Sequence, residues 1–310
     1  MIQGNKVASP LRFAGRASAQ PRKRKINRDL LTALIFISPA LIALLVMRIL
    51  PAISAFVESL NKTNVFTLEK KFVGLDNYIE LFANPEFVNT IKVTLLFTLI
   101  VNPVQIFIAI LLAILFTRKF PLNGILRSLV IFPIAVPPAV SAVVWSAIYR
   151  PDGLANAILK GAGIPEQEWI ISPSQSLISI VILLSWIGCG YWMLFLIAGI
   201  NDIGDEIYEA ARIDGAGFLR QTRSITLPLL RRPLAFVLVA DTVSNFLIFA
   251  PVAILTNGGP EGSTSLLMFD IFTRAYNYGD VGKAAAAVFI LILLMLVAVV
   301  GQFAMLRSKD

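Results

Sequence analysis

Long apolar stretches recur along this chain of 310 residues, and they limit what it can fold into. Their approximate bounds are 30–51, 91–117, 128–149, 177–200, 234–256 and 284–306. A helix needs about 20 mainly apolar residues to cross the hydrocarbon core of a bilayer. Because apolar residues do not alternate with polar ones in these stretches, they indicate membrane helices rather than barrel strands. The sequence therefore predicts an all-α membrane protein with six transmembrane helices.

The charges of the chain fit a membrane orientation better than a nucleic-acid surface. The net charge is +8, and 18 of the 27 Lys and Arg residues fall in the segments 1–29, 118–127, 201–233 and 307–310. These segments lie on one side of the membrane if both termini do, and positive residues favour the cytoplasmic side. We therefore expect both termini in the cytoplasm and no nucleic-acid partner. Residues 1–29 are expected to form a basic tail, and 30–310 the transmembrane domain.

Several residue types that catalysis commonly needs are scarce or absent in the sequence. The chain has no histidine, and Cys189 is its one cysteine. The stretch 279–284 is rich in glycine, but it lacks the spacing and the Ser or Thr of a phosphate-binding P-loop. We therefore predict a protein that is not an enzyme, with no cofactor or metal of its own and no ATP hydrolysis by this chain.

One long polar segment, 201–233, separates two apolar stretches on the predicted cytoplasmic side. Residues 205–211 are expected to form a short helix that ends at Gly215, since glycine readily adopts a positive φ. A second helix is expected from 218 to 227, closed by Pro228. The segment carries both acidic and basic side chains, which suits a specific docking surface. An ordinary amphipathic helix at the membrane interface is the alternative.

The pattern Glu209-Ala210-Ala211, then Gly215 and the Ile-x-Leu-Pro of 225–228, resembles the EAA loop of ATP-binding-cassette importer permeases. The stretches 72–78, 149–156 and 255–260 resemble sequences of the carbohydrate branch of that family, which contains the larger maltodextrin-permease subunit and glycerol-phosphate permeases. The resemblance implies the type I importer permease fold. It also implies a coupling helix that docks on an ATPase, formed by Glu209, Ala210, Ala211, Asp214 and Gly215.

The same resemblance implies the partners of the chain. They are a second permease subunit, a cytoplasmic ATPase dimer that uses ATP and Mg²⁺, an extracytoplasmic substrate-binding protein, and a sugar or sugar-like substrate. The protein is then expected in the bacterial inner membrane, where it moves the solute by alternating access.

A polar group inside an apolar stretch marks a candidate substrate site. Asp241 lies about 10 Å deep at helical rise, with Asn245 one turn further along the same face. The resemblance adds Gly188, Tyr191 and Asn245 as residues that line the sugar. Physically, a glycine leaves room for a ring, an aromatic face covers sugar C–H groups and an amide pairs with hydroxyls. A buried structural contact for Asp241 and plain helix packing for Tyr191 are the alternatives.

Three prolines, Pro133, Pro137 and Pro138, interrupt the third apolar stretch and predict a bend there. The bend could open the pathway or be a static kink.

Two other functions compete with the importer permease. An ion-coupled secondary transporter would need a proton or sodium site and paired repeats, whereas the sequence offers a single deep carboxylate. A polytopic membrane enzyme would need a catalytic cluster near one face. Co-purification with an ATPase would favour the permease over both.

Overall fold

The computed structural model describes residues 26–63, 69–118 and 120–306. The predicted basic tail lies mostly outside these residues. The chain divides into two units, residues 1–53 and 54–310. The first unit contains α1 (Ile26–Leu44), a π-helical turn η1 (Leu45–Ile49) and the start of α2 (Leu50–Ser59). Its stretch from Leu30, continued through α2 to Ser59, is long and apolar enough to cross a membrane.

The second unit begins with a small polar cap around a two-stranded hairpin. Strands β1 (Asn61–Thr63) and β2 (Lys70–Phe72) pair antiparallel, and α3 (Asp76–Ala83) follows them. The side-chain amide of Asn77 donates to the carbonyl oxygens of Ser59 and Asn61, at 2.9 Å each. Lys283 Nζ lies 2.7 Å from Glu80 Oε2. The cap is therefore tied to the start of α15 (Val281–Leu306).

Two long apolar helices form the centre of this unit, α4 (Pro85–Phe116) and α8 (Ser176–Asn201). Helix α4 begins in a favourable way: Asn84 caps it by accepting from the backbone N–H of Glu86 at 2.8 Å, and Pro85 occupies the first turn. Helices α4 and α8 pack against each other along much of their length. They match the predicted stretches 91–117 and 177–200, while α15 matches 284–306.

The third apolar stretch is bent, as its prolines predict. It consists of α5 (Asn123–Ile131), the 3₁₀ turn η2 (Phe132–Ala135) and α6 (Pro138–Ile148). The two arms, Asn123–Ala135 and Pro138–Ile148, meet at 103°. Neither Pro137 nor Pro138 has a backbone N–H to continue the helix, so the helix restarts at Pro138. Helix α7 (Leu154–Gly161) lies in the connection to α8.

The fifth stretch, 234–256, is not one helix. Helix α12 (Arg231–Phe246) stops, and α13 (Ala250–Leu255) starts after three intervening residues. Pro251 lies in the first turn of α13, where a missing backbone N–H costs least, and this favours a new helix start there. A loop and then α14 (Leu267–Phe272) and the π turn η4 (Thr273–Asn277) lead to α15.

The described residues contain four helices that are long and apolar enough to cross a membrane, or five if the bent pair forms one span. An all-α membrane fold is therefore present, while the count of six crossings stays a prediction. The difference lies at the broken stretch of α12 and α13.

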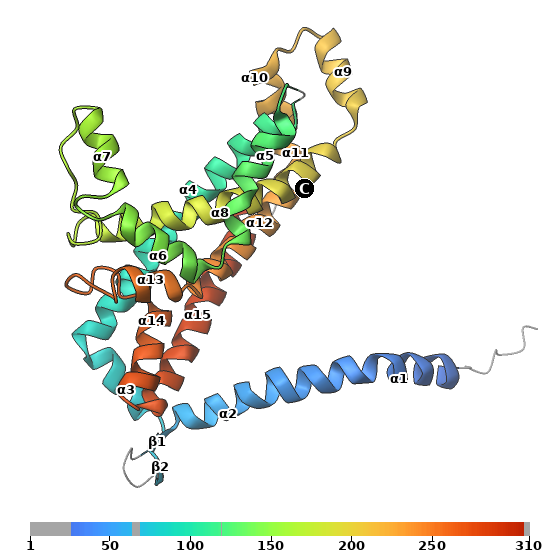
Figure 1. The fold of residues 1–310 in the computed structure, drawn as a ribbon. Coiled ribbons are helices and arrows are strands. Elements are labelled where there is room, and N and C mark those ends of the chain that lie inside the picture. The colour runs from blue at the N-terminus through green and yellow to red at the C-terminus, as the bar shows by residue number, and fades with distance from the viewer. Residues whose placement is uncertain (1–25, 64–68, 119, 307–310) are drawn as a thin grey trace, which may run out of the picture. The chain divides into compact units, whose positions relative to one another are not determined.

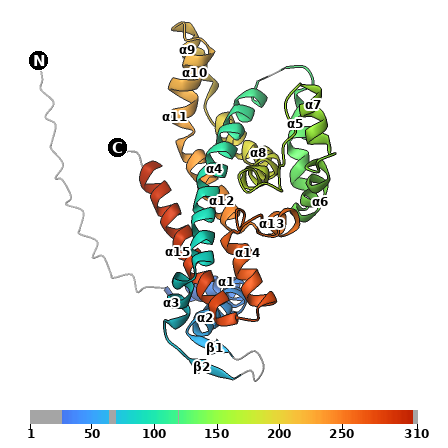
Figure 2. The same ribbon diagram turned by 90° about the vertical axis from the view of Figure 1, so that its left-hand side faces the viewer.

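A helical hairpin projects from one end of the second unit, and α3 lies at the opposite end (Figures 1 and 2). The hairpin consists of α9 (Asp205–Ile213), α10 (Phe218–Gln221), the π turn η3 (Thr222–Thr226) and α11 (Leu227–Leu229). It connects α8 to α12 directly. The EAA pattern is thus carried between the two helices that hold the predicted substrate residues.

Candidate functional site

A cluster of buried amides lies where α4, α8 and α12 meet. Asn245 Nδ2 on α12 donates to Asn102 Oδ1 at 2.9 Å and to Gln105 Oε1 at 3.0 Å, both on α4. The exposed fractions of the three residues are 5%, 3% and 2%. In so apolar a setting, each of these polar groups needs a partner, and here they satisfy one another.

Thr242 extends this amide cluster toward α15. Its Oγ1 accepts from Asn102 Nδ2 at 2.6 Å and from Gln302 Nε2 at 2.7 Å. The same hydroxyl donates to the carbonyl oxygen of Leu238 at 2.8 Å, one turn back in α12. Three helices are therefore joined by polar side chains within the apolar interior.

Gly188 lies beside the amide cluster on α8, as its predicted role requires. A Cβ atom added there would lie 3.2 Å from Gln105 Nε2, a tight but not prohibitive distance. Because Gly188 has no side chain, the side-chain amide of Gln105 can lie close to the backbone of α8. The structure thus groups Gly188 and Asn245 through a residue that the sequence analysis did not single out.

Asp241 is almost fully buried one turn before Asn245. Its exposed fraction is 1%, and its carboxylate interacts with the side chains of Trp192 and Asn245. The Oδ2 atom has no hydrogen-bond partner among the described residues. A buried acceptor left free in this way is costly unless a ligand or a partner chain supplies a donor.

Tyr191 lies in aromatic packing rather than in the amide cluster. Its ring centroid is 4.7 Å from that of Trp192 and 5.1 Å from that of Phe195. No ring contact or hydrogen bond described for Tyr191 reaches Asn245. Tyr191 is half-buried, so one part of its ring is open to a ligand or a second subunit.

The hairpin holds a tight helix end at the position that the sequence predicts. Gly215 has φ of 76°, its N–H donates to Arg212 O at 3.0 Å, and the N–H of Ala216 donates to Ala211 O at 2.8 Å. This pair of bonds is the Schellman motif, which satisfies the free carbonyls at the end of α9. Only glycine adopts this φ without strain.

Side-chain hydrogen bonds brace the two arms of the hairpin. The hydroxyl groups of Tyr208 and Thr226 lie 3.0 Å apart, and Gln221 Nε2 donates to the carbonyl oxygen of Ala216 at 2.7 Å. Pro228 lies in the last turn, α11, close to the predicted end of the second helix. The π turn η3 just before it was not predicted. It forms where Leu227 N–H bonds to Thr222 O, one residue further back than in an α-helix.

The predicted coupling residues lie mostly on the surface of the hairpin. Glu209, Ala210, Asp214 and Gly215 are exposed, and Ala211 is half-buried. Two large apolar side chains on the same hairpin are even more exposed, Ile213 at 87% and Leu219 at 79%. Exposed apolar side chains beside a rigid turn suit contact with another protein.

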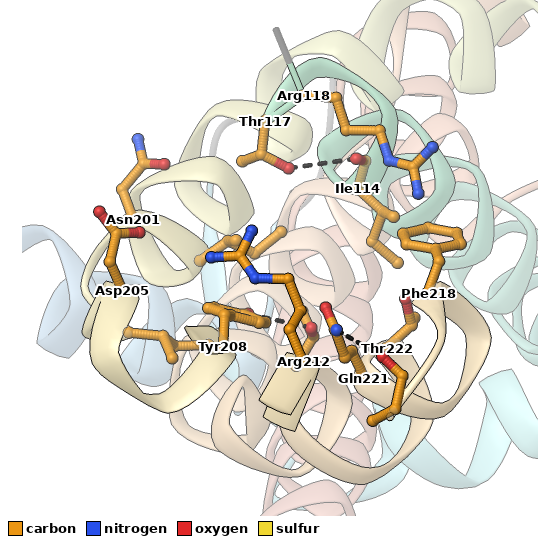
Figure 3. A pocket seen from close by; sticks show the side chains of 14 residues that line it. Ile114, Thr117, Arg118, Asn201, Asp205, Tyr208, Arg212, Phe218, Gln221 and Thr222 are labelled. Atoms are coloured by element: carbon orange, nitrogen blue, oxygen red, sulfur yellow. Dashed lines mark hydrogen bonds between the residues drawn. The ribbon is translucent and has the colours of Figure 1, made fainter. Parts of the chain in front are cut away.

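A pocket with a volume of about 810 Å³ lies between the hairpin and the ends of α4 and α8 (Figure 3). Its walls carry both apolar and polar side chains from the two sides. At its rim the guanidinium of Arg118 covers the ring of Phe218, with 3.5 Å from Cζ to the ring centroid.

Among the described residues, no group of three His, Cys, Asp or Glu side chains could hold a metal ion. The chemistry that the amide cluster offers is therefore neutral hydrogen bonding, with donors and acceptors from Asn and Gln. The hairpin offers a rigid, exposed surface. Together they describe an all-α membrane protein with a polar cluster between its helices and an exposed helical hairpin at one end.

The chain belongs to the family described as binding-protein-dependent transport system inner membrane component, which matches residues 105–308. It is therefore a permease subunit of an ATP-binding-cassette transporter, a transport protein rather than an enzyme. The family supports the importer permease over the ion-coupled transporter.

Two named relatives illustrate the similarity. The trehalose/maltose transport system permease protein MalF of Thermococcus litoralis is 35% identical over 253 residues, 81% of this chain and 85% of the relative. The sn-glycerol-3-phosphate transport system permease protein UgpA of Agrobacterium fabrum is 29% identical over 277 residues, 89% of this chain and 94% of the relative.

A solved structure shares the fold. A chain of the bacterial alginate ABC transporter, in complex with alginate pentasaccharide-bound periplasmic protein, aligns with a TM-score of 0.79. The alignment covers 91% of this chain and 96% of that chain, at 21% sequence identity. This likeness bears out the permease fold.

Sequence reasoning missed Asn102, Gln105, Thr242 and Gln302. A signal for two of them was present, because Asn102 and Gln105 are amides in the middle of the predicted apolar stretch 91–117. Their partners on α12 are about 140 positions away in the sequence, so the pairing itself was not readable.

Proposed function

We propose that this chain forms one side of the pathway of an ATP-driven sugar importer. It would work with a second permease subunit, an ATPase dimer on the hairpin side and a binding protein on the opposite side. The hairpin then faces the cytoplasm, as do both termini, and the chain uses ATP only through the partner ATPase.

One observation carries this proposal: the hairpin lies between α8 and α12 and is braced as a unit. Helix α8 holds Gly188 and Tyr191, and α12 holds Asp241 and Asn245. A push on the hairpin would therefore reach both predicted substrate helices through the backbone. Coupling of this kind needs rigid elements with two discrete arrangements.

The sugar is supported by the chemistry of the site and by the relatives. Amide side chains such as Asn245 offer both a donor and an acceptor, which matches the paired donor and acceptor character of a hydroxyl. The relatives described above are named for trehalose or maltose and for sn-glycerol-3-phosphate, both rich in hydroxyl groups. We therefore propose a sugar or sugar-like substrate.

The contact with the ATPase is proposed at the hairpin tip. Ile213 and Leu219 provide apolar contact area, while Glu209 and Asp214 provide charged neighbours. Ala210 has a small side chain that permits close approach. These features together support docking of a protein rather than simple adsorption of the hairpin to a lipid surface.

Reconstitution tests this function directly. The chain is assembled in liposomes with its second permease, its ATPase and its binding protein, and uptake of labelled maltose and trehalose is followed with and without ATP. ATP-dependent uptake that requires all four components supports the proposal. Uptake by this chain alone under an ion gradient, or failure of the ATPase to co-purify, would contradict it.

A further inference from the structure

The chain path leaves α4 without a covalent connection to the hairpin. Helix α8 enters the hairpin through residues 202–204, and α12 follows it at Arg231. Helix α4 instead ends at Phe116, and the chain continues into α5. Yet α4 carries Asn102 and Gln105, two members of the amide cluster. Movement of the hairpin therefore needs a non-covalent route to reach this part of the site.

The pocket described above lies between the end of α4 and the hairpin. Ile114 and Thr117 line it from α4, and Tyr208 and Thr222 line it from the hairpin (Figure 3). Packing between α4 and the hairpin helices is sparse compared with that between α4 and α8. A contact that crosses this gap therefore joins two elements that otherwise pack only sparsely against each other.

Arg118 makes such a contact. Its guanidinium lies over the face of the Phe218 ring, with 3.5 Å from Cζ to the ring centroid (Figure 3). At this distance the positive charge is attracted by the electrons of the ring face. Phe218 is the first residue of α10 and directly precedes Leu219, one of the exposed apolar side chains at the hairpin surface.

The backbone that carries Arg118 is itself anchored. Thr117 Oγ1 donates to Ala113 O at 2.8 Å, and Asn123 Nδ2 donates to the carbonyl oxygens of both Phe116 and Arg118. These bonds fasten the turn after α4 to the last turn of the helix. The backbone of Arg118 is therefore coupled to the end of α4.

We propose that Arg118 is a positioning residue that clamps Phe218 to the end of α4, so that hairpin movement reaches Asn102 and Gln105. Gln105 lies 13 residues before Arg118 in the sequence, which is about 20 Å along a helix. The clamp makes α4 a third helix that responds to the hairpin, beside α8 and α12. This inference rests on the proposed importer function, because it assumes an ATPase that moves the hairpin.

The test compares variants in the reconstituted complex, with sugar imported per ATP hydrolysed as the readout. A contact of this type at an exposed site shifts an equilibrium by about two- to fivefold, so Arg118→Ala should lower the ratio by about that factor while the ATPase still co-purifies. Arg118→Lys should retain part of the coupling, because it keeps the charge but not the planar stacking group. Phe218→Tyr should behave like the unaltered protein.

Two further variants identify the contact itself. Phe218→Leu removes the ring and keeps apolar bulk, so it should match Arg118→Ala, and the double variant should be no worse than either single one. Arg127→Ala is the matched control, since Arg127 lies in the same basic segment, outside the contact with Phe218. Its ratio should be unchanged.

Several outcomes would overturn the clamp. Normal coupling by Arg118→Ala in an intact complex would be one. A second would be a coupling defect in Arg118→Ala that Phe218→Leu lacks, because Arg118 would then act through its charge at the membrane or through lipid contact. Loss of assembly in all four single variants at Arg118 and Phe218 would assign a structural role instead. These results differ from failure of the proposed function, in which the unaltered complex shows no ATP-dependent uptake.

Discussion

Asn245 provides the most direct test of the amide cluster as a substrate site. Asn245→Ala removes two side-chain hydrogen bonds, to Asn102 Oδ1 at 2.9 Å and to Gln105 Oε1 at 3.0 Å. Bonds of this type between membrane helices contribute about 0.6 kcal/mol each and up to about 1.7. Two of them therefore predict a loss of about 1–3 kcal/mol in the free energy of unfolding.

Transport separates a structural role of Asn245 from a substrate role. If the amide also binds a sugar hydroxyl, losing that bond costs a further ~0.5–1.5 kcal/mol, or about a two- to twelvefold weaker apparent affinity for the sugar. We expect this loss in uptake measured over a range of sugar concentrations, with ATP hydrolysis and complex assembly retained. Thermal unfolding of the purified complex reports the stability part.

Ser244→Ala is the control on the same helix. Ser244 is exposed, and its hydroxyl bonds to Ala240 O of its own helix at 2.9 Å, outside the amide cluster. It should leave both stability and uptake nearly unchanged. If Asn245→Ala lowers stability but takes up sugar with the affinity of Ser244→Ala, the amide cluster is structural. Full uptake by a Tyr191→Ala, Asn245→Ala double variant would show that the sugar does not pass by these two residues.

Four further changes have defined expected outcomes. Gly190→Ala should prevent stable folding, because a Cβ there would lie 2.1 Å from Val130 O, whereas Gly301→Ala, with open space around it, should fold normally; expression and thermal unfolding report both. Gly215→Val should destabilise the end of α9 by about 1–3 kcal/mol and weaken ATPase co-purification, since valine resists the positive φ of 76°; unchanged co-purification and transport would contradict this. Asp241→Asn should leave assembly intact and alter uptake if the carboxylate binds substrate, and a loss of assembly would show a structural role. The ammonium groups of Lys283 and Lys62 lower the pKa of Glu80, so the stabilisation by Glu80 is complete at neutral pH and lost as the pH falls through the lowered pKa; an acid unfolding profile of Glu80→Gln identical to that of the unaltered protein would rule this contribution out.

Much of the helical framework was predictable because membrane helices are specified by composition. The stretches 91–117, 177–200 and 284–306 correspond to α4, α8 and α15 within a few residues, apart from the N-terminal end of α4, which begins at Pro85. The long polar cap before residue 91 hides that start, although Asn84 and Pro85 are a recognisable helix beginning.

The interruption of the fifth stretch shows where composition stops being informative. Residues 234–256 are apolar enough to suggest one helix, yet α12 ends at Phe246 and α13 begins at Ala250. Pro251 suits the first turn of a helix and so favours a start here, but a proline alone does not specify a break, because Pro103 lies inside the unbroken α4. The prolines at 133, 137 and 138 predict a bend in the third stretch, and that bend is present.

The hairpin was predictable at Gly215 and not at Arg118. A glycine after a short helix is a local signal, and the hydrogen bonds of the Schellman motif join residues within one turn. The contact of Arg118 with Phe218 joins positions 100 residues apart. In the sequence, Arg118 fits the basic flank of a membrane helix just as well.

The arrangement around Gln105 links the site to alternating access. The Nδ2 group of Asn245 already donates to Asn102 and Gln105, and Gln105 also fills the space beside Gly188. A sugar hydroxyl can accept from this Nδ2 group only if at least one of these partners withdraws. Asn102 is held further by Thr242, whereas no second side-chain hydrogen bond is described for Gln105. Gln105 is thus the group that a shift of α4 would free first, and α4 is the helix that Arg118 joins to the hairpin.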